Sequence, residues 1–288
     1  MSRPPFLTLP AGAAAYRLGT ARGEFAAHDA RPASAARGTV LLVPGFTGSK
    51  EDFIALLEPL AAAGFRAVAV DGRGQYESPG PRDQTAYGRD ELALDVLAQA
   101  TAVSAATEDP VHLLGHSLGG LIARAAVLKD PGAFSSLTIM SSGPAAISAA
   151  QQARTKLLID ALTVMDMESV WQAMRELDPP EAADAATPPG VREFLHQRWL
   201  ATVPEQLIAT GRQLSAEPDR VGELAAAGLP VHVLSGEVDY AWPVPLMDEM
   251  AERLSAHRTV IGGAEHSPNV ERPRETADAL VSFWRGMG

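Results

Sequence analysis

The 288-residue sequence contains no cysteine, which excludes disulfide bonds, a thiol nucleophile and thiolate metal ligands. It also has no run of lysine and arginine, and its formal net charge is −11. Such a charge repels nucleic acids and anionic membranes, so we expect neither as a partner. No apolar run approaches the roughly 18 residues that span a bilayer, and the proline-interrupted N-terminus is a poor signal peptide. These absences favour a cytoplasmic protein without a membrane span.

Motifs for metals and nucleotides are missing as well. The sequence contains no HExxH, GxGxxG or GK[ST], and its seven histidines are scattered rather than set at ligand spacing. We therefore expect no metal and no cofactor. The composition, 46% hydrophobic and 20% charged, is that of an ordinary globular protein, and a chain of this length is expected to form one core with an insertion.

Short apolar runs alternate with helical patterns along most of the chain. The runs, each followed by turn residues, cover 39–45, 66–74, 111–117, 136–143, 230–239 and 258–266. Continuous apolar strands separated by helices indicate a mostly parallel sheet with helices on both faces, and therefore an α/β fold. Residues 6–10, 15–20 and 24–29 have the pattern of short antiparallel strands added at one edge.

This rhythm stops between residues 144 and 228, where no strand pattern appears. Instead the sequence shows helical segments at 145–165, 167–177, 190–202 and 204–214. We interpret 144–228 as a helical cap, or lid, inserted into a core made of residues 1–143 and 229–288. The stretch 178–190 is rich in proline, alanine and aspartate, and we expect it to be mobile.

The most informative motif is GHSLGG at residues 115–120, because it lies directly between an apolar strand pattern and a helical one. A serine between glycines at a strand-to-helix turn is the pattern of a nucleophile elbow, which exposes the serine hydroxyl. The motif alone occurs by chance in unrelated chains, so its meaning depends on which residues come after the other strands.

Ligands of open α/β sheets bind beyond the carboxyl ends of the strands. The residues that come after the predicted strands include Gly45, Phe46, Asp71, Ser117, Ser141, Ser142, Asp239 and His266. A nucleophile, a carboxylate and an imidazole are thus expected to converge, in the chain order Ser, Asp, His. For Asp71 we expect a turn-stabilising role rather than a catalytic one.

With these motifs the chain resembles the α/β-hydrolase superfamily, in its capped serine esterase-like branch. The resemblance extends over nearly the whole chain and rests on VPGFTGS, DGRG, GHSLGG, GEVDYAWP and AEHSPNVERP, which occur in register. The chain departs from the family at residues 73–78, where RGQYES replaces a pattern like RGxGxS. Tyr76 therefore stands where the family usually has a small residue.

The resemblance implies a catalytic triad in which Ser117 is the nucleophile, His266 the general base and Asp239 the acid that orients it. It also implies an oxyanion hole formed by the backbone N–H groups of Phe46 and Leu118. Glu237 is the nearest rival to Asp239, which we prefer because its position matches the family acid. A plain helix-capping role for Asp239 remains the alternative.

Three side chains are candidates for binding the substrate. Trp242 is the first, because the position three residues after the family acid usually borders the pocket. Trp171 and Met174, three apart on one face of a predicted cap helix, are the others. For the two cap residues, packing between the cap helices is the favoured alternative, because an amphipathic helix needs a buried face. We expect an apolar pocket that admits an aliphatic or aromatic acyl group.

The sequence thus predicts a cofactor-independent serine hydrolase that cleaves a carboxylic ester of a small-molecule acyl substrate. A thioesterase, an acyltransferase, a carbon-carbon bond hydrolase or a perhydrolase would use the same residues, and a non-catalytic ligand-binding member of the fold would keep the pocket. Dehalogenases and epoxide hydrolases are disfavoured because those branches have an aspartate where this chain has Ser117. The sequence indicates neither the acyl and leaving groups nor the oligomeric state.

Overall fold

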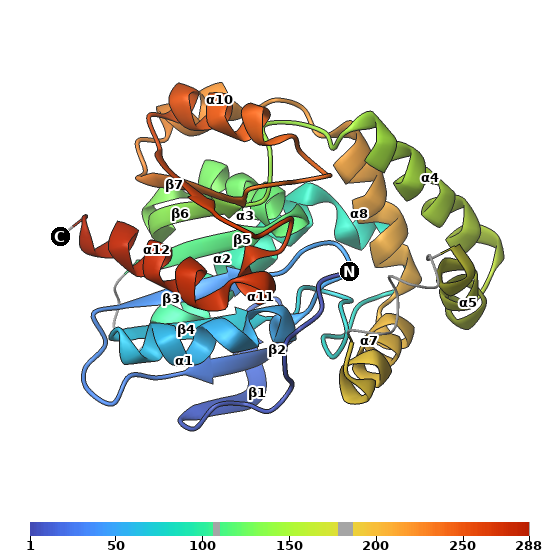
Figure 1. The fold of residues 1–288 in the computed structure, drawn as a ribbon, viewed down its shortest axis with the longest axis horizontal. Helices are drawn as coiled ribbons and strands as arrows, with labels where there is room; N and C mark the ends of the chain where they lie inside the picture. The colour runs from blue at the N-terminus through green and yellow to red at the C-terminus, as the bar shows by residue number, and fades with distance from the viewer. Residues whose placement is uncertain (106–109, 178–186, 288) are drawn as a thin grey trace.

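The computed structural model describes residues 1–105, 110–177 and 187–287 (Figure 1). Eight strands form one sheet in the order β1-β2-β4-β3-β5-β6-β7-β8. The first two strands pair antiparallel with each other and β2 pairs antiparallel with β4, whereas the remaining pairs are parallel. The strands are β1 (Ala13–Thr20), β2 (Gly23–Ala30), β3 (Gly38–Val43), β4 (Phe65–Val70), β5 (Val111–His116), β6 (Phe134–Met140), β7 (Val231–Gly236) and β8 (His257–Ile261). The predicted α/β fold is confirmed.

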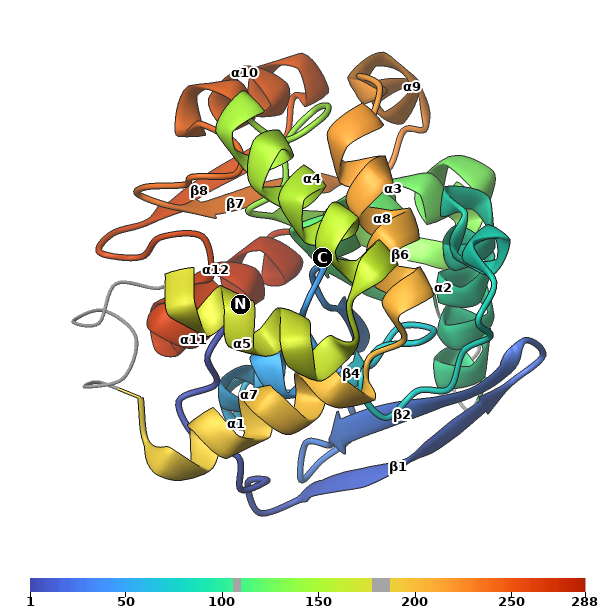
Figure 2. The ribbon, with the colours of Figure 1, turned by 90° about the vertical axis from the view of Figure 1, so that its right-hand side faces the viewer.

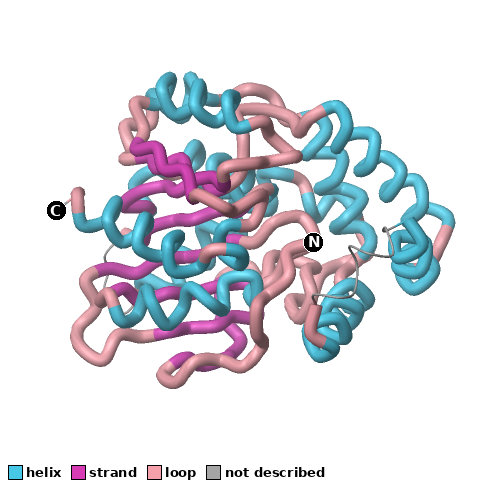
Figure 3. The backbone as a smooth tube through the Cα atoms, in the orientation of Figure 1, coloured by secondary structure: helices cyan, strands magenta, loops and turns pink. Residues whose placement is uncertain are grey.

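Helices cover both faces of the sheet, as the continuous apolar strands require (Figure 3). Successive strand residues face opposite sides, so that Leu113 belongs to one core cluster and Leu114 to the other. On one face lie α1 (Ile54–Ala62) and α12 (Pro273–Arg285). On the other lie α2 (Arg89–Ser104), α3 (Leu118–Lys129) and α10 (Val244–Leu254). Short helices η1 (Lys50–Phe53), η2 (Gln84–Tyr87), η3 (Pro131–Ala133) and α11 (Pro268–Glu271) lie in the connections.

The predicted strand at residues 6–10 was wrong, since this segment is a loop. Pro10 has no N–H to donate to a neighbouring strand, and its carbonyl instead accepts a hydrogen bond from Ala13 N–H in the turn that leads into β1. Leu9 packs against the core cluster formed with α1 and α12. The apolar residues of this segment are therefore used in packing rather than in a strand.

The chain between β6 and β7 is helical, and most of it lies beyond one end of the sheet (Figure 2). Its helices are α4 (Ala149–Val164), α5 (Met167–Leu177), α7 (Pro189–Ala201), α8 (Pro204–Ala216) and α9 (Val221–Ala226). The first four lie near the carboxyl ends of the strands, whereas Val221 and Leu224 of α9 belong to the core cluster that contains α3 and α10. Most of the stretch predicted to be mobile, residues 178–186, lies outside the described residues.

No helix within the described ranges is both long and apolar enough to cross a lipid bilayer.

Candidate active site

Ser117 lies at the turn between β5 and α3, with φ 55° and ψ −119°. This backbone conformation is unfavourable for any residue with a side chain, and it projects the serine out of the turn. A Cβ on Gly119 would stand 2.6 Å from the Pro44 carbonyl oxygen, so only glycine allows the chain after β3 to lie this close to α3. The strand-turn-helix setting predicted for GHSLGG is therefore present.

Three of the predicted site residues meet in one chain of hydrogen bonds. The Nε2 atom of His266 lies 3.1 Å from Ser117 Oγ, and its Nδ1 lies 2.8 Å from Asp239 Oδ2. The other carboxylate oxygen of Asp239 accepts the backbone N–H groups of Ala241 at 2.7 Å and Trp242 at 3.0 Å. Those two donors fix the carboxylate, so that its other oxygen faces Nδ1 of the imidazole and Nε2 is the nitrogen that faces Ser117.

Glu237, the alternative to Asp239 as the acid, forms its hydrogen bond with another residue than His266. The Glu237 side chain accepts a hydrogen bond from Gly263 N–H at 3.0 Å, and within the described ranges no hydrogen bond joins it to His266. Asp239 follows β7 and His266 follows β8, so neighbouring parallel strands place the two side chains together.

The neighbouring histidine in the elbow, His116, holds the backbone of the loop that carries His266. Its Nε2 lies 2.8 Å from the His266 carbonyl oxygen and therefore donates to it. Burial, with a smaller contribution from the nearby His266, lowers the pKa of His116 to about 3. His116 is thus a neutral structural donor at ordinary pH. A single sequence offered no signal for this contact, because it joins residues 150 positions apart.

Two backbone N–H groups were predicted to form an oxyanion hole. Leu118 is the first residue of α3, and the first N–H groups of a helix have no partner within it. The peptide between Gly45 and Phe46 lies beside the nucleophile, since a Cβ on Gly45 would stand 3.2 Å from Ser117 Cβ. No backbone carbonyl of the described residues accepts a hydrogen bond from Phe46 N–H. Both residues therefore lie beside Ser117, and their role as oxyanion donors stays a prediction.

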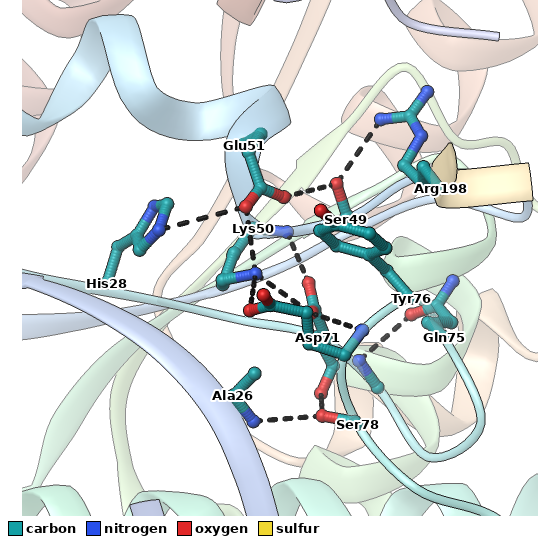
Figure 4. Close-up of polar contacts among 12 residues, drawn as sticks. Ala26, His28, Ser49, Lys50, Glu51, Asp71, Gln75, Tyr76, Ser78 and Arg198 are labelled. Carbon is teal, nitrogen blue, oxygen red and sulfur yellow. Dashed lines mark hydrogen bonds and ion pairs between the residues drawn. The ribbon is translucent and has the colours of Figure 1, made fainter. Parts of the chain in front are cut away.

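A buried polar cluster supports the segment that follows Phe46 (Figure 4). Asp71, at the end of β4, accepts hydrogen bonds from the Lys50 backbone N–H at 2.7 Å and from Lys50 Nζ at 3.1 Å. Lys50 Nζ also pairs with Glu51 at 2.8 Å and Glu77 at 2.7 Å. Burial raises the pKa of Asp71 to about 7, and the Lys50 ammonium limits that rise. Asp71 therefore ties the loop after β3 to the loop after β4, in agreement with a turn-stabilising role.

Ser117 and His266 open onto a cavity of about 180 Å³. The inserted helical region contributes Ile147, Gln151, Thr155 and Leu214 to its walls, and the loop after β7 contributes Tyr240. The Tyr240 ring lies 4.8 Å from the His266 ring, centroid to centroid. The core side of the wall includes Met1, Ser2, Gly45, Phe46, Thr47, Gly48, Asp52, His116 and Ala241. This lining mixes polar and apolar side chains, whereas the sequence pattern predicted an apolar pocket.

The three predicted substrate-binding side chains do not line this cavity. Trp242 is 1% exposed, its Nε1 donates to the Ala145 carbonyl oxygen at 2.8 Å, and its ring packs closely against Gly143. Trp171 stacks on His196 at 5.1 Å. Met174 packs with it in the apolar cluster inside the helical insertion. Trp171 and Met174 therefore follow the packing alternative, and Trp242 is likewise used in packing.

Sequence reasoning missed the side chains that do line the cavity from the insertion. Gln151 and Thr155 are four residues apart and therefore share one face of α4, but nothing in the sequence marks that face as the one turned toward Ser117. Tyr240 directly follows Asp239 in the sequence. This position beside the predicted acid was the clearest signal that sequence reasoning overlooked.

Comparison with known proteins agrees with this architecture. A profile of the alpha/beta hydrolase fold family matches residues 38–178. The pimeloyl-[acyl-carrier protein] methyl ester esterase of Aeromonas hydrophila is 28% identical over 238 residues, covering 78% of this chain and 87% of that protein. The monoacylglycerol lipase of Mycolicibacterium smegmatis is 29% identical over 260 residues, covering 86% and 88%. The solved structure of a thermophilic esterase from Thermogutta terrifontis superposes with a TM-score of 0.75 at 22% identity, covering 95% and 99%.

The chain belongs to the α/β-hydrolase superfamily. Relatives that cover most of this chain are named as an esterase and a lipase, which supports a hydrolase enzyme within that superfamily.

Proposed function

We propose that the protein is a cofactor-independent serine esterase that cleaves a small-molecule carboxylic ester through an acyl-enzyme. The observation that carries this proposal is the hydrogen-bond chain from Ser117 through His266 to Asp239, with its serine end at the wall of a cavity. A serine hydroxyl is a weak nucleophile on its own, and this arrangement supplies the base that activates it.

In the acylation step, Ser117 Oγ attacks the ester carbonyl carbon while its proton passes to His266 Nε2. Asp239 stabilises the imidazolium that forms, and the N–H groups of Phe46 and Leu118 stabilise the oxyanion of the tetrahedral intermediate. The carbon-oxygen bond to the alcohol then breaks, and His266 gives its proton to the departing oxygen. Water repeats the sequence on the acyl-enzyme, so that a carboxylic acid and free Ser117 are regenerated.

The relatives support an ester as the substrate, since two are named for ester or lipid hydrolysis and cover most of this chain. A thioester, or transfer of the acyl group to another acceptor, would use the same three residues. The cavity of about 180 Å³ favours a small acyl or alcohol group over a bulky one. We further propose that residues 144–228 act as the cap, because Ile147, Gln151, Thr155 and Leu214 close the cavity over Ser117.

The test is turnover of activated esters and acyl thioesters of graded chain length by the native chain and by Ser117→Ala. The variant should lose at least about 10⁴-fold in kcat and should no longer be labelled by a fluorophosphonate. Ser142→Ala is the matched control, because Ser142 is a second serine near the start of α3, is fully buried, and has a hydroxyl without a hydrogen-bond partner among the described residues. Full activity in Ser117→Ala would overturn the proposal.

A further inference from the structure

We infer that Gln75 is a positioning residue that fixes the Gly45–Phe46 peptide in the orientation needed to stabilise the oxyanion. This inference rests on the proposed function. Gln75 lies in the loop after β4, is 5% exposed, and donates from Nε2 to the Gly45 carbonyl oxygen at 2.7 Å. The same nitrogen lies 3.4 Å from the Phe46 carbonyl oxygen. The side-chain amide thus holds the loop that carries the predicted oxyanion donor.

The contact matters because Gly45 C=O and Phe46 N–H belong to one peptide group. The chain contains no cis peptide among the described residues, and in a planar trans peptide the C=O and N–H bonds point in opposite directions. Because Gln75 holds the carbonyl oxygen, the Phe46 N–H points away from Gln75, and we infer that it faces the cavity that Gly45 and Phe46 line. Rotation of this peptide would replace a donor by a carbonyl oxygen and would repel the developing negative charge.

Other contacts fix the side-chain amide of Gln75 itself. Its Oε1 accepts the Gly72 N–H at 3.0 Å, which leaves Nε2 as the end that faces Gly45. Besides Gln75, the Gly48 N–H donates to the Gly45 carbonyl oxygen, at 3.1 Å. Gln75 is therefore not the sole donor to that oxygen, and its loss should weaken the orientation without abolishing it.

The loop that carries Gln75 is also tied to the helical insertion. The Gly74 carbonyl oxygen accepts a hydrogen bond from Val203 N–H at 2.8 Å. Tyr76, where the family usually has a small residue, has φ 41° and packs its ring edge-on against Phe194 at 5.5 Å. Lys50 Nζ lies 4.7 Å above the centre of the same ring. These contacts offset the cost of a positive φ at a large residue, and they hold the loop in place around Gln75.

The experiment compares Gln75→Glu with the native protein, using an activated ester and a trifluoromethyl ketone that forms a tetrahedral adduct with the serine. Glutamate keeps the length and the acceptor for Gly72 but loses the donor to Gly45. We expect kcat to fall by about 10- to 100-fold with KM unchanged within twofold, since loss of a whole oxyanion donor costs about 10²- to 10³-fold. The affinity for the ketone should fall by the same factor as kcat. A role in stability alone would leave both quantities unchanged in the folded protein.

Gln99→Glu is the matched control. Gln99 is 2% exposed on α2 and lines a small internal cavity together with Gln75, but within the described part of the chain it makes no hydrogen bond to Gly45 or Phe46. It should retain native kcat and native ketone affinity. If Gln75→Glu does not fold, Gln75→Met, which keeps the length without a donor, takes its place.

The outcomes separate this inference from the proposed function. Activity that survives Ser117→Ala overturns the proposed function. A second outcome is that activity depends on Ser117, whereas the Gln75 variant keeps kcat and ketone affinity within twofold of the native values. That outcome overturns only the role of Gln75. A rise in KM at native kcat, or an equal loss in Gln99→Glu, overturns it as well.

Discussion

The sheet core and the helical insertion hold their parts of the site by different means. On the core side each reacting side chain follows a strand and is fixed by hydrogen bonds to backbone or to another site residue, as Asp239 is by Ala241 and Trp242. On the insertion side the helices are held by an apolar cluster that contains Trp171 and Trp199. Sheet geometry therefore places the reacting groups, whereas the opposite wall of the cavity depends on how helices pack.

A buried ion pair next to the cavity joins the two regions. Arg198 of α7 is 1% exposed, and its NH1 lies 2.7 Å from Asp52 Oδ1 in η1, which is fully buried. The same guanidinium donates to the Ser2 carbonyl oxygen at 2.9 Å. The insertion is therefore attached to the core at a point next to the cavity, since Asp52 and Ser2 both line it.

The largest effect is expected on the core side, from Asp239→Asn. Asparagine still accepts the N–H groups of Ala241 and Trp242 through one oxygen, but its NH₂ then faces His266 Nδ1. That favours the tautomer in which Nε2 carries the proton, so the imidazole no longer accepts from Ser117. We expect kcat to fall by about 10⁴-fold with little change in stability, as measured by steady-state kinetics and thermal unfolding.

Glu237→Gln provides the control, because Glu237 receives the Gly263 N–H and has no hydrogen bond to His266 in the described structure. If Asp239→Asn kept native kcat and Glu237→Gln lost kcat instead, Glu237 rather than Asp239 would be the acid of the triad.

The second effect concerns the attachment between the regions. Arg198→Met leaves the Asp52 carboxylate buried without its partner, which should lower the free energy of unfolding by about 3–5 kcal/mol. Burial already raises the pKa of Asp52, and Arg198 limits that rise. Without Arg198 the carboxyl group takes up a proton on folding, so the variant should be closest to the native stability near pH 5 and lose stability as the pH rises toward 8.

Chemical denaturation at both pH values measures this effect. The double variant Asp52→Asn, Arg198→Met removes the titrating group, and it should lose the added pH dependence and recover part of the stability. An equal loss at pH 5 and pH 8 in Arg198→Met would show that the arginine contributes packing rather than charge compensation.

The sequence was sufficient to predict the sheet and the convergence of the three residues to which catalytic roles are assigned. Apolar strand patterns and turn residues are local signals, and parallel strands bring the residues that follow them to one edge. Ser117, Asp239 and His266 therefore come together wherever the strands do. The roles assigned to these residues stay predictions until the variants are measured.

The sequence was not sufficient for contacts that depend on how separate elements pack. The amphipathic pattern of α5 shows that Trp171 is buried, but it does not show that His196 and Trp199 rather than the cavity receive it. Gln75 lies within the RGQYES segment, but nothing in that segment indicates that its partner is Gly45, which is 30 positions away. The segment at residues 6–10 has a strand-like composition, yet no strand of the described residues pairs with it.

The smallest effect is expected on the insertion side, in the preference for acyl-chain length. The experiment compares two apolar residues of the insertion. Ile147 lines the cavity, whereas Trp171 packs between helices. Ile147→Ala should widen the cavity and shift the ratio of kcat/KM for longer over shorter acyl esters by about 10-fold, since the change of a methylene or two at a pocket wall is worth about 1–3 kcal/mol. Trp171→Ala should instead lower the free energy of unfolding by about 3–5 kcal/mol and leave that ratio within twofold. An acyl-chain series measured beside denaturant unfolding separates the two variants. If Trp171→Ala shifts the ratio as much as Ile147→Ala does, the packing of the insertion and the shape of the cavity are one property rather than two.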